Sequence, residues 1–267
     1  MKTEDLQLIS TLGQALYANP AQAQARSLET VAAMSTLAGG PGDEFLERAL
    51  GLMLHQAERD GLRSSVSGIS SPFFRLSAKE RFVLFLLHSG RASYRRVARL
   101  LSITSEDVQA IAWQARVQIA SSPDVRMTAP HPSGSSKLKQ SCPEYDPAKP
   151  WMQKFIDDEM GTPELSFLQN HTAVCPDCQR ALNSTREFYY AVEKWVPLSV
   201  VTANTEELGA TLKRALRRGQ IEAGQLPSDL RFFEAVGLFI RKRENLIWLG
   251  LLGLLLFALA FAKSRVS

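Results

Sequence analysis

Cysteine and histidine are scarce in this chain, whose 267 residues include three Cys and four His. All three cysteines fall between residues 142 and 178, too few for the disulfide framework of a small secreted domain. No secretory signal is expected, because no long apolar stretch follows the N-terminus. His55, His88 and His131 stand apart from any paired nucleophile or glycine-rich phosphate loop. We therefore expect a protein that is not an enzyme.

Strand patterns are missing as well. Apolar residues recur instead at three- and four-residue spacing, over residues 5–18, 20–38 and 44–60 among others. This pattern predicts an all-α fold. The hydrophobic content of 45% is ordinary for globular protein, and the length allows two modest domains with tails.

Charge is unevenly distributed, although the formal net charge is only +4. Residues 1–62 carry four basic and eight acidic side chains. Arginines and lysines then cluster between residues 75 and 99, where Glu80 is the only acidic residue. This asymmetry is compatible with a nucleic-acid-binding face, and also with a solvated helix surface.

One long apolar run stands near the end of the sequence. Residues 246–262 carry no charge over about 25 Å of helix, which predicts a transmembrane helix. Arg241, Lys242 and Arg243 precede the run, whereas Lys263 and Arg265 follow it. The excess of basic residues on the first side predicts a single-pass protein with residues 1–245 in the cytoplasm.

The cysteines and one histidine are spaced as metal ligands. His171-x3-Cys175 places two ligands on one helix face, Cys175-x2-Cys178 adds a second thiolate, and Cys142 can supply the fourth. Three thiolates and one imidazole favour a closed, structural Zn²⁺ site. Three alternatives remain: a redox-active Cys-x2-Cys pair, a site without Cys142 completed by water or Asp177, and a degenerate site without metal.

The residues around these ligands carry a family resemblance. The sequence over residues 155–160, the Pro163-Glu164-Leu165 segment and the His-x3-Cys-x2-Cys motif together resemble the zinc-binding anti-sigma domain of bacteria. The resemblance covers residues 142–198 and departs from the family in Asp158, where glycine is usual. It implies a helical unit that holds zinc and clamps a sigma factor.

A helix-turn-helix is predicted upstream of the zinc motif. Ser77 and Glu80 form a capping box that opens a helix ending near Gly90. A second helix follows from Ser93, and Thr104 caps a third after a tight turn. These spacings are typical of a helix-turn-helix.

This segment, residues 72–120, resembles region 4 of the extracytoplasmic-function sigma factors. The matching residues are Ser93, Tyr94, Val97, Ala98, Leu101, Ile103, Thr104 and Val108. The resemblance implies contacts with promoter DNA, for which the candidate residues are Arg95, Arg96, Arg99, Gln109, Trp113 and Arg116. The third helix departs from the family because Arg116 is its only basic residue, and because Glu106 and Asp107 would repel phosphates.

Six segments follow from these patterns. We predict a degenerate sigma region 2-like domain (1–70), the helix-turn-helix (71–120), a flexible linker (121–141), the zinc-binding domain (142–198), basic juxtamembrane helices (199–245) and the transmembrane helix (246–262). Large apolar side chains over residues 181–196 either complete the zinc-domain core or contact a partner.

Together these features predict a membrane-tethered bacterial transcription regulator in the inner (cytoplasmic) membrane. Its sigma-like half would be held by its own zinc-binding half, and its partners would be core RNA polymerase and promoter DNA. The alternative is an anti-sigma factor or membrane scaffold for a separate sigma factor. In that case the sigma-like half would be a protein-interaction module without DNA binding.

Overall fold

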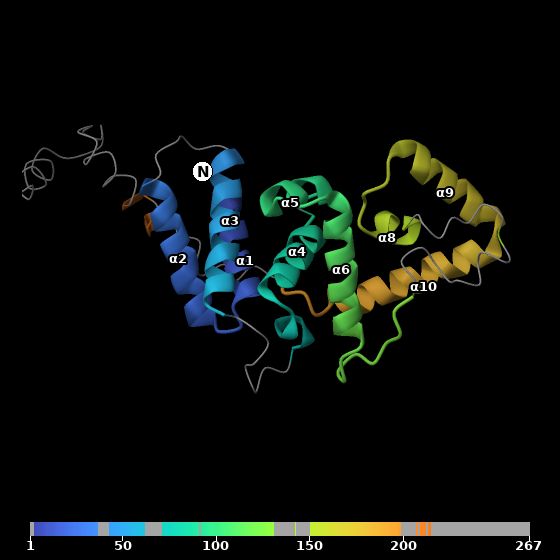
Figure 1. The fold of residues 1–267 in the computed structure, drawn as a ribbon, viewed down its shortest axis with the longest axis horizontal. Helices are drawn as coiled ribbons and strands as arrows, with labels where there is room; N and C mark the ends of the chain where they lie inside the picture. The colour runs from blue at the N-terminus through green and yellow to red at the C-terminus, as the bar shows by residue number, and fades with distance from the viewer. Residues whose placement is uncertain are drawn as a thin grey trace, which may run out of the picture. The chain divides into compact units, whose positions relative to one another are not determined.

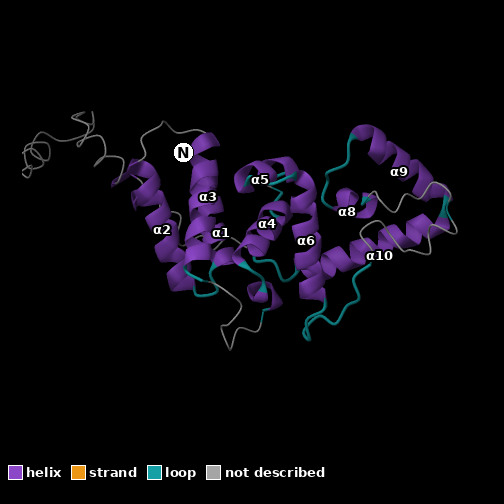
Figure 2. Ribbon diagram, in the orientation of Figure 1, coloured by secondary structure: helices purple, strands orange, loops and turns teal. Residues whose placement is uncertain are grey.

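The computed structural model describes residues 3–36, 43–61, 71–90, 92–130, 142, 150–198, 207, 209–211 and 213–214. The described helices are α1 (Thr3–Leu16), α2 (Pro20–Thr36), α3 (Asp43–Arg59), the 3-10 helix η1 (Pro72–Arg75), α4 (Ala78–His88), α5 (Tyr94–Leu101), α6 (Ser105–Ala120), α8 (Trp151–Ile156), α9 (Thr162–Val174) and α10 (Pro176–Glu193) (Figure 1). Within these residues there is no strand, which confirms the all-α prediction (Figure 2).

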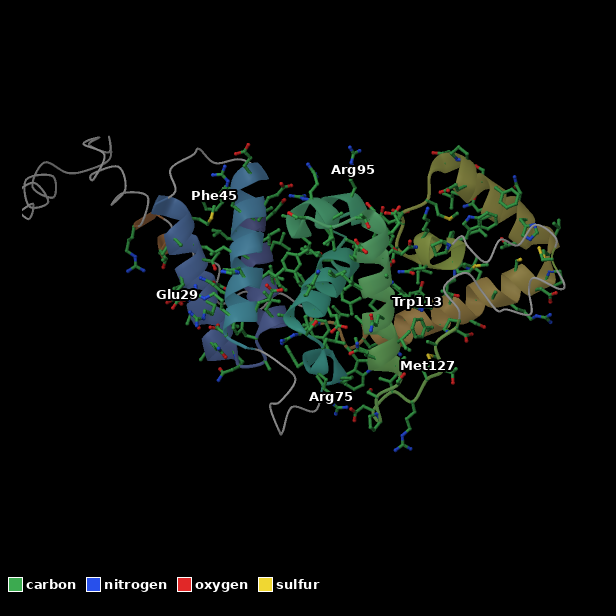
Figure 3. The ribbon with its side chains drawn as sticks, viewed as in Figure 1. Glu29, Phe45, Arg75, Arg95, Trp113 and Met127 are labelled. Atoms are coloured by element: carbon green, nitrogen blue, oxygen red, sulfur yellow. The ribbon has the colours of Figure 1, made fainter. Side chains whose placement is uncertain are left out.

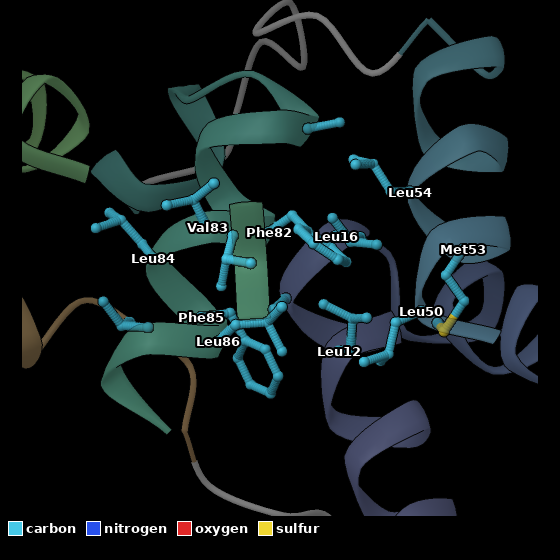
Figure 4. Close-up of a cluster of buried hydrophobic side chains, with 14 of the residues drawn as sticks. Leu12, Leu16, Leu50, Met53, Leu54, Phe82, Val83, Leu84, Phe85 and Leu86 are labelled. Carbon is cyan, nitrogen blue, oxygen red and sulfur yellow. The ribbon is translucent and has the colours of Figure 1, made fainter. Parts of the chain in front are cut away.

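The first six α-helices share one apolar core. Leu12 and Leu16 of α1, Leu50 of α3 and Phe82 of α4 are buried together in it (Figure 4). Helices α1 and α2 approach closely at Gly13, where an added Cβ would lie 2.3 Å from the hydroxyl oxygen of Ser27. Buried residues on both sides of the predicted boundary at residue 70 belong to this one core.

The three helices predicted for the helix-turn-helix are present as α4, α5 and α6. Both predicted caps form, because Ser77 accepts a hydrogen bond from the backbone of Glu80 and Thr104 accepts one from Asp107. Helix α5 ends at Ser102, which adopts a left-handed backbone conformation with φ of 53°. This residue turns the chain into the third helix.

A second, much smaller core lies between α8, α9 and α10. It contains Cys142, Met152, Leu168, Cys178 and Leu182. Helix α10 belongs to both cores, because Phe188 and Val192 in its later turns are buried in the core of the first six α-helices. It reaches from α9 to α6 (Figure 1). Of the apolar side chains over residues 181–196, Leu182 thus lies in the smaller core, and Phe188, Val192 and Val196 lie in the core of α1–α6.

The fold class and the localisation predicted from the sequence need a correction concerning the membrane. None of the described helices combines the length and the apolar character that crossing a bilayer requires. Helix α10 reaches 18 residues, but it carries charged side chains such as Arg180, Arg186 and Glu187. The described structure therefore gives no support to a single-pass membrane protein. The segments predicted as juxtamembrane helices and transmembrane helix, 199–245 and 246–262, lie largely or wholly outside the described residues.

Candidate functional site

The four predicted metal ligands lie together. His171 stands in the last turn of α9, Cys175 links α9 to α10, Cys178 lies in the first turn of α10, and Cys142 comes from the segment before α8. Their ligand atoms all lie within 4.8 Å of one another. The Nε2 atom of His171 is 3.2 Å from the sulfur of Cys142 and 3.3 Å from the sulfur of Cys178.

These distances fit a tetrahedral metal ion. With metal–sulfur bonds of 2.3 Å and metal–nitrogen bonds of 2.0–2.1 Å, neighbouring ligand atoms should be about 3.6 Å apart. The two His171–cysteine separations, 3.2 and 3.3 Å, are slightly shorter, and Cys142 belongs to the cluster despite its distance in sequence. The cluster can therefore hold a metal ion with four ligands and without Asp177.

The surroundings favour ligand atoms in fixed positions. Phe167 stacks on the imidazole of His171, with ring centroids 5.7 Å apart and an interplanar angle of 8°, and Trp151 packs edge-on against Phe167. The backbone N–H of Cys178 lowers the pKa of the Cys175 thiol. Burial raises the pKa of Cys178, which favours its protonated form as long as no cation is nearby.

A second polar cluster joins the segment after α8 to α5 and α6. Arg116 of α6 has no exposed surface, and its guanidinium pairs with both carboxylate oxygens of Asp157, which follows α8. The Tyr94 hydroxyl also donates to Asp157, and the Tyr94 backbone N–H donates to Glu159. Burial raises the pKa of Tyr94 and keeps this hydroxyl protonated as a donor.

His88 and Tyr189 complete the surroundings of Arg116. The rings of His88 and Tyr189 are stacked with centroids 4.6 Å apart, and the Nε atom of Arg116 donates to Nε2 of His88 at 3.3 Å. Burial, reinforced by the positive charge of Arg116, lowers the pKa of His88 well below its usual value. A neutral imidazole can accept the bond from Arg116. Burial would lower the pKa of Arg116 itself, but the charge of Asp157 raises it.

Two further contacts cover α6. The Gln153 side chain of α8 donates to the backbone carbonyl of Gln109 at 2.8 Å. Trp113 packs against Phe188 of α10 with ring centroids 5.2 Å apart, where α6 meets α10 (Figure 3). Each of the three predicted DNA-contacting residues of α6 therefore has a contact with α8, with the residue after it or with α10, although for Gln109 the contact is made by the backbone carbonyl.

The predicted DNA-contacting arginines of α5 lie elsewhere. Arg95 is exposed and points outward (Figure 3). Arg96 and Arg99 lie 3.5 Å and 3.9 Å from a carboxylate oxygen of Glu47 in α3. The structure thus brings the four metal ligands together but separates the DNA candidates into an α5 group and an α6 group.

Sequence reasoning missed the residues that hold the two halves together: His88, Tyr94, Asp157, Glu159 and Tyr189. Tyr94, Asp157 and Glu159 belong to the segments that carry the two family resemblances, but no pattern within one chain segment indicates that they pair. A usable clue was Arg116, a lone arginine on the otherwise uncharged stretch of α6 between residues 108 and 120. Such a residue requires a buried acceptor once that face is covered.

Comparison with protein-family models, with curated proteins and with solved structures finds no match to this chain. The functional argument therefore depends on the geometry of the metal cluster and of the α6 surface.

Proposed function

We propose that the chain is a transcription regulator whose sigma-factor-like half, α1–α6, is held by its own zinc-binding half, α8–α10. One observation carries this proposal. Two α6 side chains expected to reach DNA are engaged within the chain: Trp113 packs against Phe188 of α10, and Arg116 pairs with Asp157 after α8. The Gln109 side chain is buried, and its backbone carbonyl accepts a hydrogen bond from Gln153 of α8. A helix covered in this way cannot enter the major groove.

Zn²⁺ is the metal that we propose for the cluster. Cys142, His171, Cys175 and Cys178 form a soft, closed ligand set without a carboxylate, which suits structural zinc. When bound, the ion would cross-link the segments that lead into α8 and α10. Because Cys142 and Cys178 also supply much of the small core, its loss would release α8 and α10 from α6.

The partners of the released half would be promoter DNA and core RNA polymerase. Before release, the contact between the two halves is favoured over contacts with separate partners, because both halves belong to one chain. If the linker predicted over residues 121–141 behaves as a flexible coil, it would span roughly 25 Å, which would give an effective concentration in the millimolar range. A clamp of micromolar intrinsic affinity would then be mostly closed.

A second candidate function has support of its own. Glu47 faces two of the α5 arginines, and Glu106 and Asp107 are exposed in the first turn of α6. These acidic groups oppose a DNA phosphate backbone. In this case the sigma-like half would be a protein-interaction module, and the chain would act as an anti-sigma factor or scaffold for a separate sigma factor.

The deciding experiment opens the clamp in the full chain. Phe188→Asp places a charge against Trp113, whereas Tyr190→Asp changes an exposed ring two residues away on the same helix. We expect Phe188→Asp to gain binding to core RNA polymerase and to duplex DNA, measured by co-purification and fluorescence anisotropy, and Tyr190→Asp to behave as wild type. If Phe188→Asp opens the interface and binds neither partner, the second candidate function replaces the first.

A further inference from the structure

The helix-turn-helix presents a group of hydrogen-bond donors at the place where it meets the segment after α8. Arg116 contributes two guanidinium nitrogens, and Tyr94 contributes its hydroxyl and its backbone N–H. Every one of these donors is directed at a carboxylate oxygen of Asp157 or Glu159. The helix-turn-helix supplies the positive charge of this cluster, and the segment after α8 supplies the negative charge.

The donors have the chemistry of a receptor for two neighbouring anions. A guanidinium pairs in the same two-pronged way with a carboxylate or a phosphate. The Tyr94 N–H lies in the first turn of α5, where free N–H groups and the helix dipole favour an anion. His88 stands behind the guanidinium and accepts from its Nε, which leaves the two terminal nitrogens for Asp157.

We propose that this receptor is a binding site for two backbone phosphates of DNA, and that Asp157 and Glu159 occupy it as internal substitutes for those phosphates. This inference rests on the proposed function. DNA is favoured over an acidic peptide because α5 also carries Arg95 and Arg99 at exposed positions, and the single carboxylate of Glu47 near Arg96 and Arg99 leaves an excess of positive charge on this helix. A regularly spaced phosphate backbone can follow these charges. The acidic loop then competes directly with DNA, in addition to covering α6.

The test removes the two charges from the full chain and keeps the side-chain shapes. The test variant is Asp157→Asn/Glu159→Gln. Its matched control is Asp158→Asn/Glu187→Gln, which removes two exposed charges, one from the same loop. Asp158 has a positive φ of 56°, which asparagine tolerates.

The probe is a fluorescent duplex of about 20 base pairs and arbitrary sequence, because phosphate contacts do not depend on sequence. We expect the test variant to bind at least about tenfold more tightly than wild type, and the control to stay within about twofold.

A second arm asks whether Arg116 makes the new contact. Adding Arg116→Gln to the test variant should reverse most of the gain and reduce the slope of log Kobs against log salt by about 1. Arg48→Gln in α3, which removes the same charge from an exposed position, should leave the gain in place. Circular dichroism and metal content of each variant verify that the fold is retained. If the double variant is unstable, Glu159→Gln alone replaces it. This single variant keeps the Arg116–Asp157 pair and should show a smaller gain in DNA affinity.

Each other outcome overturns the inference. No gain in the test variant, or a gain that Arg116→Gln leaves unchanged, removes the phosphate site. Preference of the test variant for a polyglutamate peptide over the duplex assigns the site to an acidic protein segment instead. Phe188→Asp separates this inference from the proposed function. If Phe188→Asp gains DNA binding and the test variant Asp157→Asn/Glu159→Gln does not, the proposed function is retained and the phosphate site is rejected. If neither variant gains DNA binding, both are rejected.

Discussion

The two cores of this molecule are stabilised in different ways. The core of α1–α6 is filled by large apolar side chains from six helices, among them Leu12, Leu50 and Phe82. The core between α8, α9 and α10 has few members, and two of them, Cys142 and Cys178, belong to the cluster that could hold a metal ion. So little apolar surface cannot offset the conformational entropy of three helices. The first core is stabilised by burial, whereas we expect the second to depend on a metal ion held by its Cys3His cluster.

Metal removal should produce the largest difference between the two cores. Structural zinc contributes on the order of 10 kcal/mol to small domains. We expect chelation, or Cys178→Ser, to unfold α8, α9 and the beginning of α10 and to leave α1–α6 folded. Calorimetry and far-ultraviolet circular dichroism would then show a lost transition beside a retained one. Ser184→Ala, at an exposed position of the same helix, is the control. A metal-free chain that melts as the loaded chain does would contradict this account.

The buried ion pair between the halves should give the next largest effect. Asp157→Ala leaves the fully buried guanidinium of Arg116 without its counterion, which typically costs about 3–5 kcal/mol. Asp124→Ala removes the partner of Arg75 from a half-exposed pair and should cost under about 1 kcal/mol. Denaturant unfolding of the two variants measures both values. Equal effects would show that the buried pair does not hold the halves together.

The smallest predicted effect is a pH dependence at the same interface. The pKa of His88 is lowered by burial and by Arg116, so the unfolded chain binds a proton more readily than the folded one. Stability contributed by neutral His88 is therefore present above the unfolded pKa, about 6.5, and is lost as pH falls below it. The slope should approach about 1.4 kcal/mol per pH unit. Denaturant midpoints measured between about pH 7.5 and 5.0 test this slope, because the range includes the usual pKa of histidine.

Two histidine variants assign that slope. His88→Gln should flatten the pH dependence, and it should also lower stability at every pH because the stacking on Tyr189 is lost. His55→Gln, on an exposed position of α3, should retain the wild-type slope. A slope that survives in His88→Gln would place the responsible group outside this interface.

Local patterns predicted local structure well. The caps at Ser77 and Thr104 and the grouping of His171 with Cys175 and Cys178 each depend on residues within one or two helical turns, so spacing alone constrains them. Cys142 also joins the metal cluster, but its approach through residues 143–149 has no periodicity from which its position could be derived.

Contacts between distant segments could not be predicted in the same way. The pairing of Arg116 with Asp157 joins residues 41 positions apart, and it exists only because α8 and α10 pack on α6. Gln109 and Trp113 were read as a surface that faces DNA, since a helix pattern shows which residues share a face but not what covers that face. The prediction of a membrane span depended on composition alone, and no described helix repeats that composition.

Helix α10 connects the Cys3His cluster directly to the contact with α6. Cys178 is one of the metal ligands, and Phe188 lies against Trp113, ten residues and about 15 Å further along the same helix. A helix does not shorten when one end is displaced, so a small tilt at the cysteine end becomes a lateral movement at the phenylalanine end. If the cluster holds a metal ion, a change in its coordination would therefore reach α6 through α10 itself, without any intermediate partner.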